Sequence, residues 1–213
     1  MDLSGNGRLV SAPRVHAWHM SQSMTTESYG YAATPLGRVL VITAGDELIG
    51  LHFDGHARTP QLGGRTNGSG ATLTAVADQL DEYFRGVRTG FELPIRLEGT
   101  PFQLAVWSAL RDIPFGQTST YAEIAARIGG PRAVRAVGAA NGRNPISIVV
   151  PCHRLIGANG DLTGYGWGLE RKRSLLELEG ADLERRPVRP GRADPGQAWV
   201  SGIETVSRSA GRP

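Results

Sequence analysis

One short stretch of the chain contains the residue types needed for covalent chemistry at sulfur. Residues 151–154 read Pro-Cys-His-Arg, and Cys152 is the single cysteine among 213 residues. A lone cysteine is more often a small apolar core residue. Beside cationic groups, however, the thiolate is favoured, and the thiolate is the nucleophilic form. Because His153 and Arg154 can supply such groups, the stretch predicts a reactive thiol.

A base and a carboxylate could activate this thiol. Adjacent side chains of an extended chain point to opposite sides, so His153 would take the proton of Cys152 through a water molecule. Glu179 ends the last expected helix and comes late enough in the chain to pack back on His153. Nucleophile, base and orienting group are the parts of many thiol enzymes. The alternative is that Glu179 is an exposed charge at a helix end, the commoner position of a glutamate.

Composition argues against several other classes of protein. One cysteine cannot form an internal disulfide, and the histidines lack the spacing of metal ligands, so we expect neither a metal nor another cofactor. No apolar run approaches the roughly 20 residues that cross a bilayer. The first 28 residues also lack the apolar block of a secretory signal. We therefore expect a cytoplasmic monomer without membrane contact.

Basic residues are concentrated in the second half of the chain. Residues 29–99 carry six Arg against eight acidic residues, whereas residues 100–180 carry nine basic against six acidic ones, and residues 181–213 carry six Arg against four acids. All but one of the basic residues are arginines, whose planar fork suits phosphates and base edges. This distribution permits nucleic-acid binding, although an ordinary solvated surface would produce the same count.

The patterning predicts an α+β protein in four parts: a disordered extension over 1–28, an α/β domain over 29–97, a mostly helical domain over 98–180 and a disordered tail over 181–213. The first domain has the β-rich runs of a three-stranded antiparallel meander up to residue 53, then a flexible Gly-rich loop over 55–70 and an amphipathic helix over 73–84.

The second domain has start signals for several helices. Thr100 and Pro101 begin one, and Ser119-Thr120 begins a second that ends near Ile128. Pro131 would open a third as far as about Ala140, which makes a helix-turn-helix, and a last helix spans 169–179. The third helix has small exposed residues around Arg135. Such a helix can approach DNA closely or can pack closely on another helix, and the pattern favours neither.

These motifs together resemble the O6-alkylguanine-DNA alkyltransferase family. The resemblance is carried by Pro-Cys-His-Arg at 151–154, Arg-Ala-Val-Gly at 135–138, Asn144-Pro145 and Gly-Tyr-Gly-Trp-Gly at 164–168. It runs from about Thr100 to Gly180 and is looser over residues 29–97. It implies a ribonuclease H-like N-terminal domain and a winged-helix-like C-terminal domain that contains the helix-turn-helix.

The resemblance also implies an activity and a site. The chain would remove the alkyl group from O6-alkylguanine in double-stranded DNA by irreversible transfer to Cys152. The damaged base would first be flipped out of the duplex through the minor groove. Removal of the alkyl group from O4-alkylthymine is left open. The implied catalytic residues are Cys152, His153, Glu179, Asn144 and Tyr121. The implied substrate-binding residues are Tyr121, Leu155, Tyr165, Gly166 and Trp167. The implied DNA-binding residues are Arg135, Ala136, Gly138, Thr120 and Arg132.

Two positions depart from the common family pattern. Ser147 stands where many members have proline, and Trp167 occupies a loop position that is glycine in some members. The indole could narrow the pocket against large adducts or could stack on them.

Two other functions remain as alternatives. A non-transferring relative would recognise alkylated bases without chemistry, but such relatives lack the cysteine that this chain has. A thiol hydrolase would use Cys152 and His153, but it would give no reason for Arg135 on a helix of small residues.

Overall fold

The computed structural model describes residues 26–183. The expected extension over 1–28 and the tail over 181–213 lie almost entirely outside these residues. The exceptions are residues 26–28 and 181–183, and of these Glu27 and Ser28 belong to the first strand. Within 26–183, no helix has both the length and the apolar character to cross a membrane.

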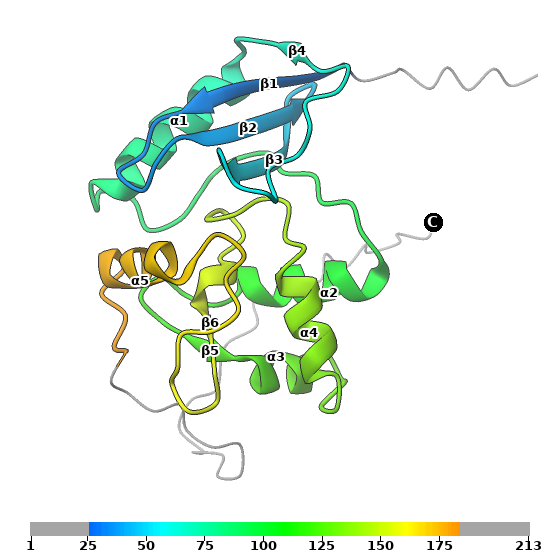
Figure 1. Cartoon of the computed structure of the whole chain (residues 1–213), viewed down its shortest axis with the longest axis vertical. Coiled ribbons are helices and arrows are strands. Elements are labelled where there is room, and N and C mark those ends of the chain that lie inside the picture. Colours follow the sequence, from blue (N-terminus) through cyan, green and yellow to red (C-terminus); the bar gives the residue numbers. More distant parts are fainter. Residues whose placement is uncertain (1–25, 184–213) are drawn as a thin grey trace, which may run out of the picture.

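The N-terminal part is a small sheet covered by one helix (Figure 1). Its elements are β1 (Glu27–Ala32), β2 (Val39–Ala44), β3 (Glu47–Phe53), β4 (Thr66–Asn67) and α1 (Ala71–Phe84). The strand order is β3-β2-β1-β4, and β1, β2 and β3 form the predicted antiparallel meander. The loop expected to be flexible over 55–70 contains β4, which pairs in parallel with β1. Helix α1 buries one apolar stripe of Thr72, Val76, Leu80 and Tyr83.

The C-terminal part is mostly helical. Its elements are α2 (Pro101–Arg111), β5 (Ser119–Thr120), α3 (Tyr121–Arg127), α4 (Val134–Asn141), a 3-10 turn η1 (Cys152–Arg154), β6 (Leu155–Ile156) and α5 (Leu169–Leu178). Thr100 and Thr120 begin α2 and α3 with capping boxes, which satisfy backbone N–H groups at the helix start. The α+β class and the helix-turn-helix of α3 and α4 are confirmed.

Helix α4 begins later than the sequence suggests. Pro131 lies in a turn in which the N–H of Ala133 donates to the carbonyl of Gly130 at 2.7 Å. Ala133 has ψ of 19°, outside the helical range, so the helix starts at Val134. Proline fits turns as well as first helical turns, and here the turn uses it. Arg132 therefore precedes the helix, whereas the expectation placed it on the helix.

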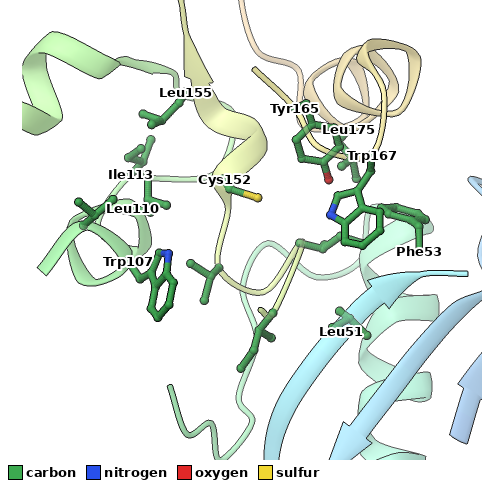
Figure 2. Packing of buried hydrophobic residues seen from close by; sticks show 14 of the residues in the cluster. Leu51, Phe53, Trp107, Leu110, Ile113, Cys152, Leu155, Tyr165, Trp167 and Leu175 are labelled. Carbon is green, nitrogen blue, oxygen red and sulfur yellow. The ribbon is translucent and has the colours of Figure 1, made fainter. Parts of the chain in front are cut away.

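One hydrophobic core joins the two parts. The sheet contributes Leu51 and Phe53, α2 contributes Trp107 and Leu110, and α5 contributes Leu175. The indole N–H of Trp107 donates to the carbonyl of Ala140 at 2.9 Å and so fixes α4 against α2. Figure 2 shows these side chains converging around Cys152. The core therefore holds the thiol at the junction of the two parts.

Candidate active site

Cys152 begins the 3-10 turn η1, so the chain here is not extended as expected. The residue is 4% exposed. In Figure 2 its sulfur points into the space between η1 and the loop that carries Tyr165 and Trp167. A tight turn is compatible with this sequence because Pro151 has no N–H to contribute to a strand. The turn buries His153 and Arg154 together with the thiol.

The turn before Cys152 is held by Asn144. The side-chain amide donates to the carbonyl of Val150 at 2.8 Å, and its oxygen accepts from the N–H of Ile146 at 3.0 Å. Between these two points, Ile148 has φ of 71°, a conformation that β-branched residues rarely adopt. Such strain, on the order of 1–3 kcal/mol, persists only where the surroundings impose it. Asn144 supplies that constraint, which agrees with the role in stabilising the turn that the resemblance implies.

The edge of the sheet also positions this turn. The N–H of Leu51 on β3 donates to the carbonyl of Pro145 at 2.9 Å, and the N–H of Ser147 donates back to the carbonyl of Leu51 at 3.0 Å. Leu51 and Ile146 form an isolated parallel bridge. Backbone pairing of this kind fixes register as well as distance. The N-terminal sheet therefore sets the position of the segment that delivers Cys152.

His153 and Glu179 are in direct contact. Nε2 of His153 lies 2.9 Å from Oε1 of Glu179, and both side chains are completely buried. Arg154 donates through Nε to Oε2 and through Nη2 to Oε1, each at 2.9 Å. Burial alone would raise the pKa of Glu179, but the hydrogen bonds from His153 and Arg154 lower it to about 2. Glu179 is thus an ionised, buried carboxylate, and the alternative of an exposed helix-end charge is wrong.

His153 is neutral in this arrangement. Burial lowers its pKa, and the hydrogen bond to Glu179 only partly opposes that shift. With Nε2 donating to Glu179, Nδ1 carries the free lone pair. Within residues 26–183, no side chain or backbone group hydrogen-bonds to Nδ1, although the atom is buried. His153 therefore has one nitrogen oriented by a carboxylate and the other available to accept a proton.

Cys152 is protonated at rest. Burial raises the pKa of its thiol, and this outweighs the lowering by a hydrogen bond from Asn144 and by the charge of Lys172. The expectation of a thiolate favoured by its own motif is therefore wrong for the resting protein. The reason is that Arg154 pairs with Glu179 and His153 is neutral. A base must remove the proton when the thiol reacts.

A cavity of about 300 Å³ lies beside the thiol. Its lining comes from both parts of the chain: His52, Arg58, Asn141, Gly142, Arg143, Asn144, Pro145, Cys152, Tyr165, Gly166 and Trp167. Arg58 reaches across from the loop after β3, where one guanidinium nitrogen donates to the carbonyl of Gly142 at 2.9 Å. The volume is at the lower end of the range of small-molecule sites. It suits one base with a small substituent.

Trp167 forms a fixed wall of this cavity. Its indole N–H donates to the hydroxyl of Ser147 at 2.7 Å, and its ring is 7% exposed. The ring centroids of Phe53 and His56 lie 6.0 and 5.3 Å from that of the indole. Figure 2 shows Trp167 between Phe53 and Cys152. The two positions that depart from the family pattern, Ser147 and Trp167, thus form one contact.

His52 on β3 gives the fold a pH dependence. Burial, with a smaller contribution from the charge of Arg65, lowers the pKa of His52 from 6.5 to about 4. Between these values the unfolded chain binds a proton that the folded chain does not. The free energy of unfolding should therefore fall as pH drops from 6.5 towards 4, by about 3 kcal/mol from this residue. Urea denaturation at several pH values measures the slope.

The control for this prediction is a pair of substitutions. His52→Gln removes the titrating ring and should flatten the slope between pH 6.5 and 4. His56→Gln tests whether the loss of a ring contact with Trp167 changes the slope by itself. A slope that is unchanged in the His52→Gln chain would contradict the assignment.

The loop over 157–168 brings the remaining pocket residues together. The hydroxyl of Tyr121 donates to the carbonyl of Thr163 at 3.2 Å. At Gly164, φ is 68° and a Cβ would lie 2.3 Å from that hydroxyl, so only glycine fits. Burial raises the pKa of Tyr121 and that of Tyr165, and a thiolate at Cys152 would raise both further. Both tyrosines are therefore neutral at rest.

The carbonyl of Leu155 already has a partner. The ammonium of buried Lys172 donates to it and to the carbonyl of Thr163, the latter at 2.6 Å. Burial lowers the pKa of Lys172 to about 8, and a thiolate at Cys152 would oppose that shift. The carbonyl of Cys152 accepts from the N–H of Leu155.

Helix α4 presents small residues and one arginine to the exterior. Arg135, Ala136 and Ala139 are exposed on it, as is Arg132 in the preceding turn. Gly138 instead faces the ring of Tyr121. Thr120 is buried, and its hydroxyl accepts from the N–H of Glu123 at 3.1 Å. The structure thus places Arg135, Ala136 and Arg132 on an open surface, but gives Thr120 a capping role and Gly138 a packing role.

Comparisons with known proteins agree with this geometry. Residues 28–97 match the family described as the 6-O-methylguanine DNA methyltransferase ribonuclease-like domain, and residues 101–181 match its DNA binding domain. Two methylated-DNA–protein-cysteine methyltransferases are similar to the chain. The protein from Mycobacterium bovis is 51% identical over 68% of this chain and 88% of the relative, and the one from Haemophilus influenzae is 43% identical over 73% and 88%. The chain belongs to the O6-methylguanine DNA methyltransferase family.

Solved structures of family members have the same fold. The O6-methylguanine methyltransferase of Mycobacterium tuberculosis superposes with a TM-score of 0.69 at 47% identity, over 75% of this chain and 98% of that one. A structure of the M. tuberculosis protein in complex with DNA superposes with a TM-score of 0.68 at 47% identity, over 72% and 92%. The family and the fold expected from the sequence are therefore confirmed.

Several residues of this O6-methylguanine DNA methyltransferase site were missed by sequence reasoning. His52 and Arg58 reach the cavity from the N-terminal part, and Lys172 reaches the loop from α5. Asn141 approaches the carbonyl of Cys152, with 3.5 Å between its amide nitrogen and that oxygen. Only Lys172 carried a signal, as the single lysine of the chain on an otherwise Arg-rich helix.

Proposed function

We propose that this chain repairs O6-alkylguanine in double-stranded DNA by transferring the alkyl group to Sγ of Cys152. The observation that carries the proposal is the buried thiol facing a cavity beside a neutral histidine that a buried carboxylate orients. Membership of the O6-methylguanine DNA methyltransferase family supports the reaction, and the relatives named above are methylated-DNA–protein-cysteine methyltransferases.

The proposed step is an in-line displacement at carbon. The bond from Sγ of Cys152 to the alkyl carbon forms as the bond from that carbon to guanine O6 breaks. The thiol proton passes, through one water, to Nδ1 of His153, whose Nε2–H is held by Glu179. Tyr121, which is neutral, would donate to guanine N3 as negative charge develops on the leaving purine. Guanine leaves as a neutral base with the proton of Tyr121, so the step leaves a tyrosinate at Tyr121 and an imidazolium at His153. Return of the proton from His153 to Tyr121 through water restores both neutral side chains.

Other pocket residues would bind and orient the base. The carbonyls of Cys152 and Leu155 would accept from the exocyclic amine, and the backbone N–H of Gly166 would donate to O6. Tyr165 could add a further hydrogen bond to the base, because its buried hydroxyl has no hydrogen-bond partner within residues 26–183. Each of these contacts would be made only after the nucleotide has left the duplex, because the thiol is 4% exposed.

The reaction would occur once for each chain. Transfer leaves a thioether on Cys152, and water does not displace a thiolate from an alkyl carbon under mild conditions. The protein would therefore act as a stoichiometric reagent. The same relay would handle O4-alkylthymine only if that smaller base can fill the cavity, and the chain is proposed primarily as a guanine repair protein.

We further propose that residues 29–97 and 98–180 are distinct domains of a cytoplasmic monomer. The cavity and the relay are both built by one chain, which supports a monomer as the active form. The proposed substrate, DNA, supports the cytoplasm as the place of action. No cofactor enters the proposed step, because the thiol, the histidine and the carboxylate supply its groups.

Helix α4 is the proposed DNA-binding element, with Arg135 inserted through the minor groove in place of the flipped nucleotide. Small neighbours such as Ala136 permit close approach, and minor-groove contact reads sequence weakly, as repair of any site requires. Arg135→Ala should lower transfer from an O6-methylguanine duplex by about tenfold or more. The rate with free O6-benzylguanine base should stay nearly unchanged.

The matched control for Arg135 is Arg85→Ala, which removes an exposed arginine from the C-cap position of α1, on the other part of the chain. It should leave both rates unchanged. Equal losses with duplex and free base in the Arg135→Ala chain would contradict the assigned role.

Trp167 should limit the size of the adduct. Because Ser147 and Phe53 fix the indole, the ring acts as a wall and does not swing over a substituent. Trp167→Gly should raise the ratio of benzyl transfer to methyl transfer by about tenfold or more. Ser147→Ala, which removes only the hydrogen bond to the indole, should raise it less. A falling ratio would mean that the ring stacks on large adducts instead.

The test of the proposed function is the fate of the DNA. After incubation with an O6-methylguanine duplex, enzymatic digestion and mass spectrometry of the nucleosides should show deoxyguanosine in place of the methylated nucleoside. The amount restored should equal the amount of protein added. Unchanged O6-methylguanine with excess protein would refute the proposal.

A further inference from the structure

Tyr83 of helix α1 reaches from the N-terminal sheet domain into the relay. Its side chain is completely buried, and its hydroxyl donates to Oε1 of Glu179 at 2.7 Å. The ring is held by aromatic neighbours, with centroids of Phe91 and Phe115 at 5.3 and 6.1 Å. Phenylalanine at this position would make the same ring contacts with the aromatic neighbours. The hydroxyl therefore requires a separate explanation.

The acceptor of this hydrogen bond is the atom that orients the base. Oε1 of Glu179 accepts from the hydroxyl of Tyr83 at 2.7 Å, and from Nε2 of His153 and Nη2 of Arg154, each at 2.9 Å. Donors that share one carboxylate oxygen also share its negative charge. A stronger bond to one donor leaves less charge for the others. The hydroxyl of Tyr83 therefore weakens the hydrogen bond between Glu179 and His153.

We propose that Tyr83 is a positioning residue of the alkyl-transfer site, through which the N-terminal domain holds Glu179 and keeps His153 in the neutral form that accepts the thiol proton. The inference rests on the proposed function and adds to it a residue from outside the DNA-binding domain.

The charged and titratable neighbours are consistent with this role. Arg154 from η1 occupies both oxygens of Glu179, and Lys172 from α5 adds a positive charge that lowers the pKa of His153 after burial and Arg154. Tyr165 carries no charge, since burial raises its pKa. Tyr83 is likewise neutral, because burial and then the charge of Glu179 raise its pKa. Tyr83 therefore keeps its hydroxyl proton and donates it to Glu179.

The consequence is a predictable shift in pH dependence. Without the hydroxyl, the charge of Oε1 is shared by His153 and Arg154 alone, so the hydrogen bond that raises the pKa of His153 grows stronger. His153 would then stay protonated to higher pH and could not act as a base there. Tyr83→Phe should therefore shift the acid limb of the pH–rate profile to higher pH.

The experiment measures single-turnover methyl transfer from an O6-methylguanine duplex to the full chain between pH 5 and 9. Tyr83→Phe is expected to raise the midpoint of the acid limb by about half a pH unit or more, which is about a threefold loss of rate below the midpoint. The matched control is Tyr31→Phe, an exposed tyrosine on β1, which should leave the midpoint in place. A midpoint that is unchanged or lower in Tyr83→Phe overturns the proposal, even if that chain melts at a lower temperature.

A second variant covers the case in which Tyr83→Phe does not fold. Replacement of Tyr83 by 3-fluorotyrosine keeps the ring and strengthens the donor, so the midpoint should move to lower pH, and no movement would equally overturn the proposal. Methyl transfer by the chain without any substitution distinguishes a failure of this inference from a failure of the proposed function. If the unchanged chain transfers no methyl group, the function fails. If it transfers and both variants keep its midpoint, only the role of Tyr83 fails.

Discussion

Cys152→Ala is expected to abolish methyl transfer from O6-methylguanine while leaving binding to duplex DNA intact. The substitution removes the only thiol of the chain, so the proposed step has no other sulfur to accept the methyl group. The exposed surface of α4 does not include Cys152, which is buried in the turn η1. Transfer is measured as methyl label on the protein, and binding by fluorescence anisotropy with a labelled duplex.

Two results would contradict this expectation. Methyl label on the Cys152→Ala chain would place the acceptor elsewhere. A complete loss of DNA binding would show that the thiol or its turn shapes the DNA surface as well. Cys152→Ser is a useful companion, because its hydroxyl keeps the polarity of the position and should also fail to accept the methyl group at a measurable rate.

Glu179→Gln is expected to lower both the transfer rate and the stability. The amide cannot carry the negative charge that Arg154 and His153 contact, and it leaves a buried guanidinium unpaired. Removing one partner of a buried ion pair costs about 3–5 kcal/mol. Loss of the orienting group for the base should lower the transfer rate by about a hundredfold. Denaturant unfolding and single-turnover kinetics at a temperature where the chain is folded measure the two effects.

The pH dependence of stability gives a second readout for Glu179. Its pKa is about 2 in the folded protein against an ordinary value of 4.5. Its ionised form therefore stabilises the fold above pH 4.5, and this contribution is lost as pH falls from there towards 2. The Glu179→Gln chain should lack that loss. Glu177→Gln, which changes an exposed residue two positions earlier on α5, is the control and should alter neither rate nor stability.

Local sequence signals predicted much of the fold. The strands around the Thr-Pro-Leu-Gly turn, the caps at Thr100 and Thr120 and the helix-turn-helix all follow from turn chemistry and helix capping, which act over a few residues. The same signals misplaced the start of α4, because Pro131 is compatible with a turn and with a helix start. Only the hydrogen bond from Ala133 to Gly130 decides between them.

The site was predicted as far as short motifs and the family resemblance could reach. The contact of Glu179 with His153 was expected and is present, but the ion pair of Arg154 with the same carboxylate was not. This pairing changes the chemistry, since it removes from the thiol the cation expected to favour a thiolate. Contacts such as Tyr83 with Glu179 join residues 96 positions apart, and no local pattern encodes them.

The paired positions Ser147 and Trp167 illustrate the same limit. Each was noticed as a separate departure from the family pattern, but their hydrogen bond appears only when the loop packs against the turn before Cys152. The physical reason is that loop conformation depends on tertiary packing more than on local propensity.

The intact mass of the protein after incubation with an excess of O6-methylguanine duplex tests the central claim most directly. The proposed reaction predicts a gain of one methyl group per chain, located by peptide mapping on the peptide that bears Cys152, and no further gain however long the incubation lasts. No mass gain despite tight binding would indicate a non-transferring DNA-binding protein. Continued consumption of methylated DNA without a modified Cys152 would indicate a catalyst that turns over, and either result would contradict the account.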